Sequence, residues 1–336
     1  MDIYFINIMI FYLLLFINFI LINSYSITFP SFPKNKAIIS NIDIKNINNN
    51  DIEQLNLLFN KIPVIIFKNQ KLTPKEYYKF IKLFDNNYNN NISLHSYNNN
   101  TIPSVPQVEL ICKNSKNIID NNKIFKNFNI DNDINDFYNY LWHQDVTGSY
   151  KYFSPIISSM YMLVSPLHND DTLFASYEDA YDLMDINLKK QIERYNVIHS
   201  NSKIREKNSI FDYTGLRRDT NYIYEDDFLT ENPFVVYSDK YKTRKTFALN
   251  PKKFLRFKEL SLDDSYNLYR HIMKKYVIRN DNIISHHWED YDLCIFNNRK
   301  LIHTSSPKCA YNNERIYLQC RLATNEPIYS LSDDLI

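Results

Sequence analysis

Hydrophobic residues along the chain fall into short runs, some with the two-residue spacing of strands and others with helical spacing. Strand-like runs occupy residues 37–44, 63–70, 107–112, 160–166, 292–305 and 314–324. Apolar positions three and four residues apart, typical of amphipathic helices, occupy residues 50–62, 72–84, 176–184, 186–195 and 261–278. Short strands with helices concentrated early and late predict an α+β chain built on an antiparallel sheet or barrel.

Two of the predicted helices begin with recognisable capping residues. Thr73, Pro74 and Glu76 stand at the N-cap, first and third positions of the 72–84 helix, the pattern of a capping box. For the helix over 50–62, Asp51 is the expected N-cap. Both helices therefore have defined starts as well as an apolar stripe.

The N-terminus is set apart by an almost unbroken apolar run over residues 6–22. A run of seventeen residues, apolar except for Asn7 and Asn18, suits a cleaved signal segment or an uncleaved membrane anchor, and a buried core helix is the third interpretation. We therefore assign residues 1–26 to a leader and 27–336 to one folded domain. The leader predicts membrane association through residues 6–22 and a location in the secretory pathway, an organelle or a membrane; without it, we expect a cytoplasmic protein.

Composition adds two constraints. The 336 residues are rich in Asn, Ile, Lys, Tyr and Phe and contain only two glycines, Gly148 and Gly215, a bias typical of AT-rich coding sequence. We read the Asn-rich stretch over about 86–136 as an insertion, and a glycine-rich phosphate-binding loop is excluded. A glycine kept in such a sequence is expected where the backbone needs one.

Net charge and cysteine spacing argue against nucleic acid binding and against a structural zinc site. The net charge of +1 gives no bulk field for nucleic acid binding. Four cysteines lack any CxxC pair, so a structural zinc site is not expected. Two disulfides are allowed by number, but cysteines isolated in apolar runs are more often buried thiols.

Candidate chemistry begins at "WHQD", where His143 and Asp145 lie two residues apart. In a strand they would share a face and could bind one Fe(II), but the pair alone also fits a buried histidine beside a carboxylate. A third ligand must come from elsewhere. His303, at the end of a later strand-like run, is the best candidate among the eight histidines.

Beyond His303, Arg315, Gln319 and Arg321 would share one face of a predicted strand. A guanidinium on an inward face needs an anionic partner, because burial of an unpaired charge is costly. A dicarboxylate cosubstrate would supply one through paired hydrogen bonds.

The chain resembles the taurine dioxygenase (TauD/TfdA-like) family of Fe(II)- and 2-oxoglutarate-dependent dioxygenases. The motifs that carry the resemblance occur in family order over most of residues 37–328: "AIISNIDI", "VIIFKNQKLTPKEYYKFIKLF", "WHQDVT", "DDTLFASYEDAYDLM", "FALNP", "HHWEDYDLCIFNNRKLIH" and "ERIYLQCRLATNEP". It implies a double-stranded β-helix, or jelly-roll, core with flanking helices. It also implies hydroxylation of a small organic substrate, with Fe(II), 2-oxoglutarate and O2 consumed together and succinate and CO2 released.

The resemblance also implies residue roles. The iron ligands would be His143, Asp145 and His303, and the distal carboxylate of 2-oxoglutarate would be bound by Arg315 and Thr172. Asn139 and Gln319 match positions near the primary substrate. A polar segment over 201–232, with Gly215 near its centre, is the expected lid.

Departures from the family pattern leave the substrate open. Taurine dioxygenases have an arginine for the sulfonate where this chain has Gln319, so a taurine-like anion is disfavoured unless Arg321 compensates. The family's "GGDT" is "NDDT" here, and "WDNR" is "FNNR".

Two other functions compete with this one. The first is a betaine-type hydroxylase of the same superfamily, which the lack of clustered cysteines disfavours. The second is a catalytically silent, membrane-tethered jelly-roll binding protein, which would not need the full ligand set. Relatives often form homo-oligomers, but no interface can be read from the sequence.

Overall fold

A computed structural model describes residues 25–29, 35–94, 101–112, 142–149, 151–166, 171–200, 229–305 and 315–331. The apolar run over 6–22, Asn139, residues 201–228 of the expected lid and most of the 86–136 insertion lie outside the described residues. No helix in the described part of the chain is long and apolar enough to cross a membrane.

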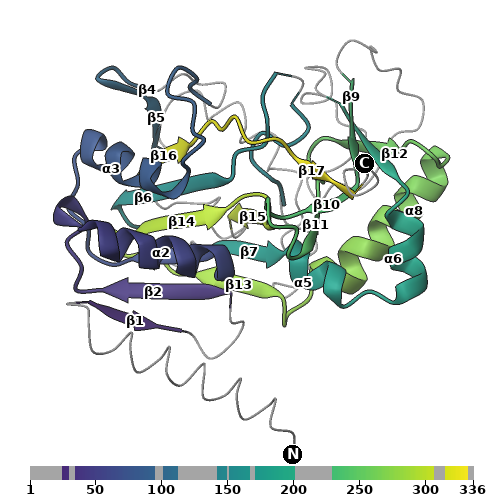
Figure 1. Ribbon diagram of the computed structural model, residues 1–336, viewed down its shortest axis with the longest axis horizontal. Helices are drawn as coiled ribbons and strands as arrows, with labels where there is room; N and C mark the ends of the chain where they lie inside the picture. Colours follow the sequence, from purple (N-terminus) through teal and green to yellow (C-terminus); the bar gives the residue numbers. More distant parts are fainter. Residues whose placement is uncertain are drawn as a thin grey trace, which may run out of the picture.

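The largest sheet has eight strands, and the last long strand of the chain lies inside it (Figure 1). Its order is β1 (Ser26–Thr28), β2 (Lys36–Ser40), β3 (Val64–Phe67), β14 (Leu293–Asn297), β6 (Ile157–Val164), β16 (Ile316–Arg321), β5 (Val105–Cys112) and β4 (Thr101–Ile102). Only β2 and β3 pair in parallel; the other neighbours are antiparallel. Because Ser26 begins β1, the end of the predicted leader belongs to the sheet instead.

A second, three-stranded sheet faces the first and completes the jelly roll. It consists of β13 (Ile283–His286), β7 (Thr172–Ser176) and β15 (Leu301–Ser305). Side chains from both sheets, including Met160 of β6, Phe174 of β7 and Phe296 of β14, pack into one buried cluster between them. The predicted α+β class and jelly-roll core are confirmed, and this interior is where the candidate ligands enter.

The outer face of the large sheet is covered by α2 (Asn49–Lys61) and α3 (Pro74–Ile81) (Figure 1). A short 3-10 turn at Ile44–Asn46 precedes α2, and another at Lys82–Phe84 follows α3. The predicted capping box of α3 is present: Glu76 N donates to Thr73 Oγ1, and Thr73 N donates to Glu76 Oε2. The predicted cap of α2 is wrong. Asn48 is the N-cap and accepts from the amide of Asp51, which lies in the first turn.

A further layer of helices packs beside the small sheet. It contains α5 (Tyr177–Asp182), α6 (Ile186–Ile192) and α8 (Leu262–Ile272), with a π-helical turn at Met273–Val277. They share a buried aromatic cluster with two small sheets, formed by β8 (Asn196–Ser200), β9 (Leu229–Pro233) and β12 (Phe254–Phe257), and by β10 (Val235–Tyr237), β11 (Lys245–Phe247) and β17 (Tyr329–Ser330).

The end of the expected lid is part of this layer. Residues 229–232 belong to β9, which pairs with β8 over its whole length. Backbone hydrogen bonds to a neighbouring strand fix these residues, so the lid predicted over 201–232 does not extend through them. The rest of the predicted lid lies outside the described residues.

Two cysteines are buried free thiols, as expected. Cys294 lies in the buried cluster between the two sheets, called the inner cluster below. Cys320 lies in the cluster between the large sheet and helices α2 and α3, and both thiols are free. Burial raises the pKa of the Cys320 thiol to about 12 and raises the pKa of Cys294 as well. The thiolate, which is the reactive form, is therefore scarce at both positions.

We predict that native protein protects Cys294 and Cys320 from thiol reagents at pH 8, because burial removes both access and thiolate. Peptide-resolved mass spectrometry after labelling would measure each site, with urea-unfolded protein as the fully reactive control. Equal labelling in the native and unfolded samples would contradict the burial described for these side chains.

Candidate metal centre

Two distant histidines are joined by a pair of main-chain hydrogen bonds. The amide of His143 donates to the carbonyl of His303 at 3.0 Å, and the amide of His303 donates back at 2.9 Å. This isolated bridge adds one residue to the edge of β15, and it brings the two imidazole rings together with centroids 4.2 Å apart and planes tilted by 45°. The two candidate ligands are therefore positioned by backbone rather than by flexible side chains.

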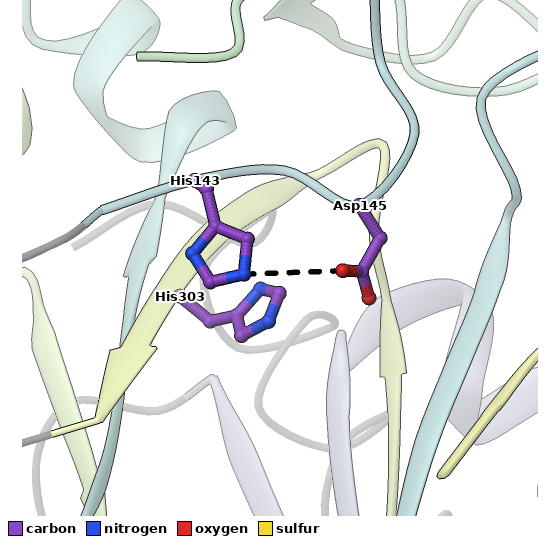
Figure 2. Close-up of side chains that lie close together, drawn as sticks. All are labelled: His143, Asp145 and His303. Carbon is purple, nitrogen blue, oxygen red and sulfur yellow. Dashed lines mark ion pairs between the residues drawn. The ribbon is translucent and has the colours of Figure 1, made fainter. Parts of the chain in front are cut away.

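Asp145 completes the group, although not in the way the sequence predicts. Over residues 142–149, the part of this segment that the structure describes, the expected strand does not form: there is only the single bridge at His143, and the chain bends at Asp145. Figure 2 nevertheless shows the three side chains converging, and one ligand atom from each lies within 4.8 Å of the others. His143 Nε2 and Asp145 Oδ1 are 3.9 Å apart.

The bend is held by Asn298, in the turn between β14 and β15. Its Oδ1 accepts the Asp145 amide at 2.7 Å, and its Nδ2 donates to the Asp145 carbonyl at 2.9 Å. Its neighbour Arg299 donates to the carbonyls of Ser154, Glu326 and Pro327, and burial lowers the pKa of that guanidinium to about 10. The turn thus fixes the loop carrying two candidate ligands against the strand carrying the third.

A second set of contacts holds the chain beyond Asp145. Asn250 Nδ2 donates to the carbonyls of Gln144 and Thr147 at 2.8 and 3.1 Å, and its amide donates to His199 Nε2 at 3.1 Å. The sequence offered no role for Asn250 or Asn298, although both lie in motifs that carry the resemblance. For Asn250 the signal that could have been used is an amide side chain between apolar neighbours, which must be hydrogen-bonded when buried; Asn298, between Asn297 and Arg299, gives no such signal.

Electrostatics favour the metal-binding forms of His303 and Asp145. Burial lowers the pKa of His303 to about 4, so its imidazole is neutral at physiological pH. Burial alone would raise the pKa of Asp145, but Arg321, His303 and His143 together hold it below its usual range. A neutral imidazole and an ionised carboxylate are the forms that bind a divalent cation.

The triad also passes a test of fit. Asp145 Oδ2 and His303 Nδ1 are buried and have no hydrogen-bond partner among the described residues. A buried polar atom without a partner costs about 1–3 kcal/mol, which a cation ligated by the triad would offset. Two histidines and one carboxylate form the facial ligand set typical of non-haem Fe(II).

The predicted 2-oxoglutarate residues lie at strand ends bordering the inner cluster. Thr172 begins β7 and pairs with Ser305, two residues beyond His303, and its Oγ1 accepts from Trp288 Nε1 at 2.9 Å. Arg315 immediately precedes β16, with its guanidinium carbon 5.0 Å from the centre of the Tyr317 ring.

The predicted substrate residues fare differently. Asn139 lies outside the described residues, and Gln319 is buried on the inner face of β16. Arg321 does not project a free charge into the site: its guanidinium contacts the carboxylates of both Asp145 and Glu109. Glu109 was not identified from the sequence, where it appears only as one polar residue within "QVELIC".

Sequence and structure comparisons agree on one family. The model of the family described as taurine catabolism dioxygenase TauD, TfdA family matches residues 28–320. A taurine dioxygenase from Burkholderia xenovorans is 14% identical, with 90% of each chain covered and a TM-score of 0.65. The structure of AAD-2 in complex with Mn(II) and N-oxalylglycine is 17% identical, covering 91% of this chain and 99% of its own, with a TM-score of 0.65. No curated protein matches the sequence significantly.

Gly148 follows the triad loop and is needed there. Its φ of +76° is in the left-handed region, and an added Cβ would lie 2.6 Å from His199 Cγ. We predict that Gly148→Ala lowers the free energy of unfolding by at least about 1–2 kcal/mol, because backbone strain and overlap add.

Urea unfolding would measure this loss, with Ser149→Ala as the neighbouring control. An unfolding midpoint for Gly148→Ala equal to that of the control would show that the loop adapts without cost.

Proposed function

The chain belongs to the taurine catabolism dioxygenase TauD, TfdA family, and we propose that His143, Asp145 and His303 hold its catalytic Fe(II). The protein is a metal- and 2-oxoglutarate-dependent dioxygenase that hydroxylates a small organic substrate, releasing succinate and CO2. The observation that carries the ligand assignment is the convergence of three ligand atoms within 4.8 Å of one another. A silent binding protein would have no need of this arrangement.

The ligands leave room for the other reactants. A ligand set of two histidines and one carboxylate occupies one face of the metal and leaves positions for 2-oxoglutarate and O2. Fe(II), when bound, supplies those open positions and the redox chemistry that couples 2-oxoglutarate decarboxylation to substrate oxidation. The chain supplies geometry: the bridge fixes the two histidines, Asn298 fixes the Asp145 backbone, and Phe174 and Phe296 pack against His303.

Arg315 and Thr172 are the residues proposed to bind the distal carboxylate of 2-oxoglutarate. The planar guanidinium of Arg315 matches a carboxylate with two parallel hydrogen bonds, and the Tyr317 ring beneath it limits its orientation. Because Trp288 already donates to Thr172 Oγ1, the threonine proton is available for an acceptor. N-oxalylglycine, present with Mn(II) in the AAD-2 structure, is an isostere of 2-oxoglutarate and supports this use of the fold.

We propose that the primary substrate presents an uncharged polar group, rather than a sulfonate, to Gln319. The amide of Gln319 can donate and accept but carries no charge, and the adjacent Arg321 is already matched to two carboxylates. A screen of 2-oxoglutarate consumption over amides, alcohols, amino acids, carboxylates, sulfonates and sulfate esters would test this. A sulfonate as the best substrate would contradict it.

We predict that anaerobic addition of Fe(II) and 2-oxoglutarate gives the weak visible charge-transfer band of their chelate. His143→Ala should abolish the band because it removes one of three protein ligands. The exposed His271 on α8 provides the matched control, and His271→Ala should keep the band. Absence of the band in folded wild-type protein would reject the proposed iron site.

We predict that Arg315→Ala raises the KM for 2-oxoglutarate roughly 10–100-fold, because it removes a charge-assisted contact of about 1.5–3 kcal/mol. The KM of Arg315→Lys should lie between those of wild type and Arg315→Ala, since lysine keeps the charge but lacks the planar guanidinium. Steady-state succinate formation would measure both, with Arg256→Ala in β12 as a control. An unchanged KM in Arg315→Ala would assign the carboxylate to another residue.

A further inference from the structure

Arg321 links two buried carboxylates on the inner face of the large sheet. Its Nε lies 3.1 Å from Asp145 Oδ1, and its Nη1 lies 3.2 Å from Glu109 Oε2. The side chains of Arg321, Glu109 and Asp145 are only 12%, 1% and 4% exposed. At such burial, bulk water screens little of the interaction, so the three charges strongly constrain one another.

Strand register explains why Glu109 can anchor this arginine. Gln319 of β16 pairs directly with Glu109 of β5, so the two side chains point to the same face. Arg321 lies two residues further along β16 and therefore also points to that face, where its backbone pairs with Ser158 of β6. The backbone of Arg321 is paired with β6, and β16 as a whole lies between β6 and β5, whereas Asp145 lies in a bend outside any named strand.

The contacts of Asp145 divide between its main chain and its side chain. Asn298 binds the amide and carbonyl of Asp145, which places the backbone but leaves rotation of the carboxylate unconstrained. Arg321 Nε contacts Oδ1 of the carboxylate, and Oδ2 has no hydrogen-bond partner among the described residues. The guanidinium therefore selects the carboxylate orientation in which one oxygen, Oδ1, faces His143 Nε2 at 3.9 Å (Figure 2).

We propose that Glu109 and Arg321 form a positioning pair for the metal-ligand carboxylate, holding Asp145 ready to bind the cation through a single oxygen. This inference rests on the proposed function, because it takes Asp145 as an iron ligand. It assigns Arg321 to the support of the centre instead of to the substrate. An anionic substrate at Arg321 would have to displace a buried carboxylate, leaving that charge unpaired.

The pair allows a charge-neutral test. The double variant E109Q/R321M removes one negative and one positive charge, so the net charge beside the centre is unchanged. Loss of a residue that orients a metal ligand typically weakens metal binding by roughly 10–100-fold. We therefore expect the Kd of E109Q/R321M for Mn(II) to be higher than that of wild type by this factor. Electron paramagnetic resonance of free Mn(II) measures the Kd without 2-oxoglutarate and without turnover.

Two further proteins separate positioning from packing. K300M/E178Q removes another buried ion pair, whose charged atoms lie 3.3 Å apart, and should keep wild-type Mn(II) affinity. R321K keeps the charge but loses the guanidinium plane, and should lose affinity by less than the double variant. If E109Q/R321M does not fold by circular dichroism, the comparison of R321K with wild type still tests the proposal.

The outcomes separate this inference from the proposed function. Wild-type protein that binds no Mn(II), or binds it equally well after Asp145→Ala, would reject the metal centre itself. If wild-type Mn(II) binding depends on Asp145 but folded E109Q/R321M binds Mn(II) as tightly as wild type, the positioning role alone is overturned. If the double variant does not fold, wild-type affinity in R321K has the same meaning. Weaker binding in the double variant, with K300M/E178Q unchanged, would establish it.

Discussion

The two amide hydrogen bonds between His143 and His303 are the contact on which the rest of the centre depends. They join a loop that has no strand of its own to the edge of a buried strand, and they set the distance between two imidazoles. Asn298 then fixes the position of Asp145 relative to that bridge. Backbone contacts therefore place the main chain of all three ligand residues, and the Arg321 guanidinium contacts the Asp145 carboxylate itself.

Charge balance decides how the interior can tolerate so many polar groups. Arg321 has two carboxylate partners, and Arg299 has three carbonyl acceptors instead of a counterion, which is why burial lowers its pKa. His303 avoids the cost of a buried charge by remaining neutral. Burial thus keeps His303 neutral, whereas nearby positive charge keeps the Asp145 carboxylate ionised despite its burial, and both are the forms that bind metal.

Much of the fold and the centre could be predicted from the sequence, because local patterns carry the information. The capping box of α3 needs only neighbouring residues, and His143, Asp145 and His303 could be grouped because the motifs that contain them occur in family order. The partners of Arg321 could not be predicted, because Glu109 reaches it only through the register of β5 against β16. The bend at Asp145 was missed for a related reason: a side-chain amide from Asn298 replaces the strand that alternation suggested.

The place of β16 between β6 and β5 has a consequence for biosynthesis. This strand follows the other strands of its sheet in the chain, so the nascent chain holds the sheet open, with unpaired edges on β5 and β6, until β16 has been synthesised. The same strand brings Arg321 to Asp145, and the strand just before it brings His303. A chain truncated before residue 316 would therefore keep the three candidate ligands but lack both the closed sheet and the arginine beside Asp145.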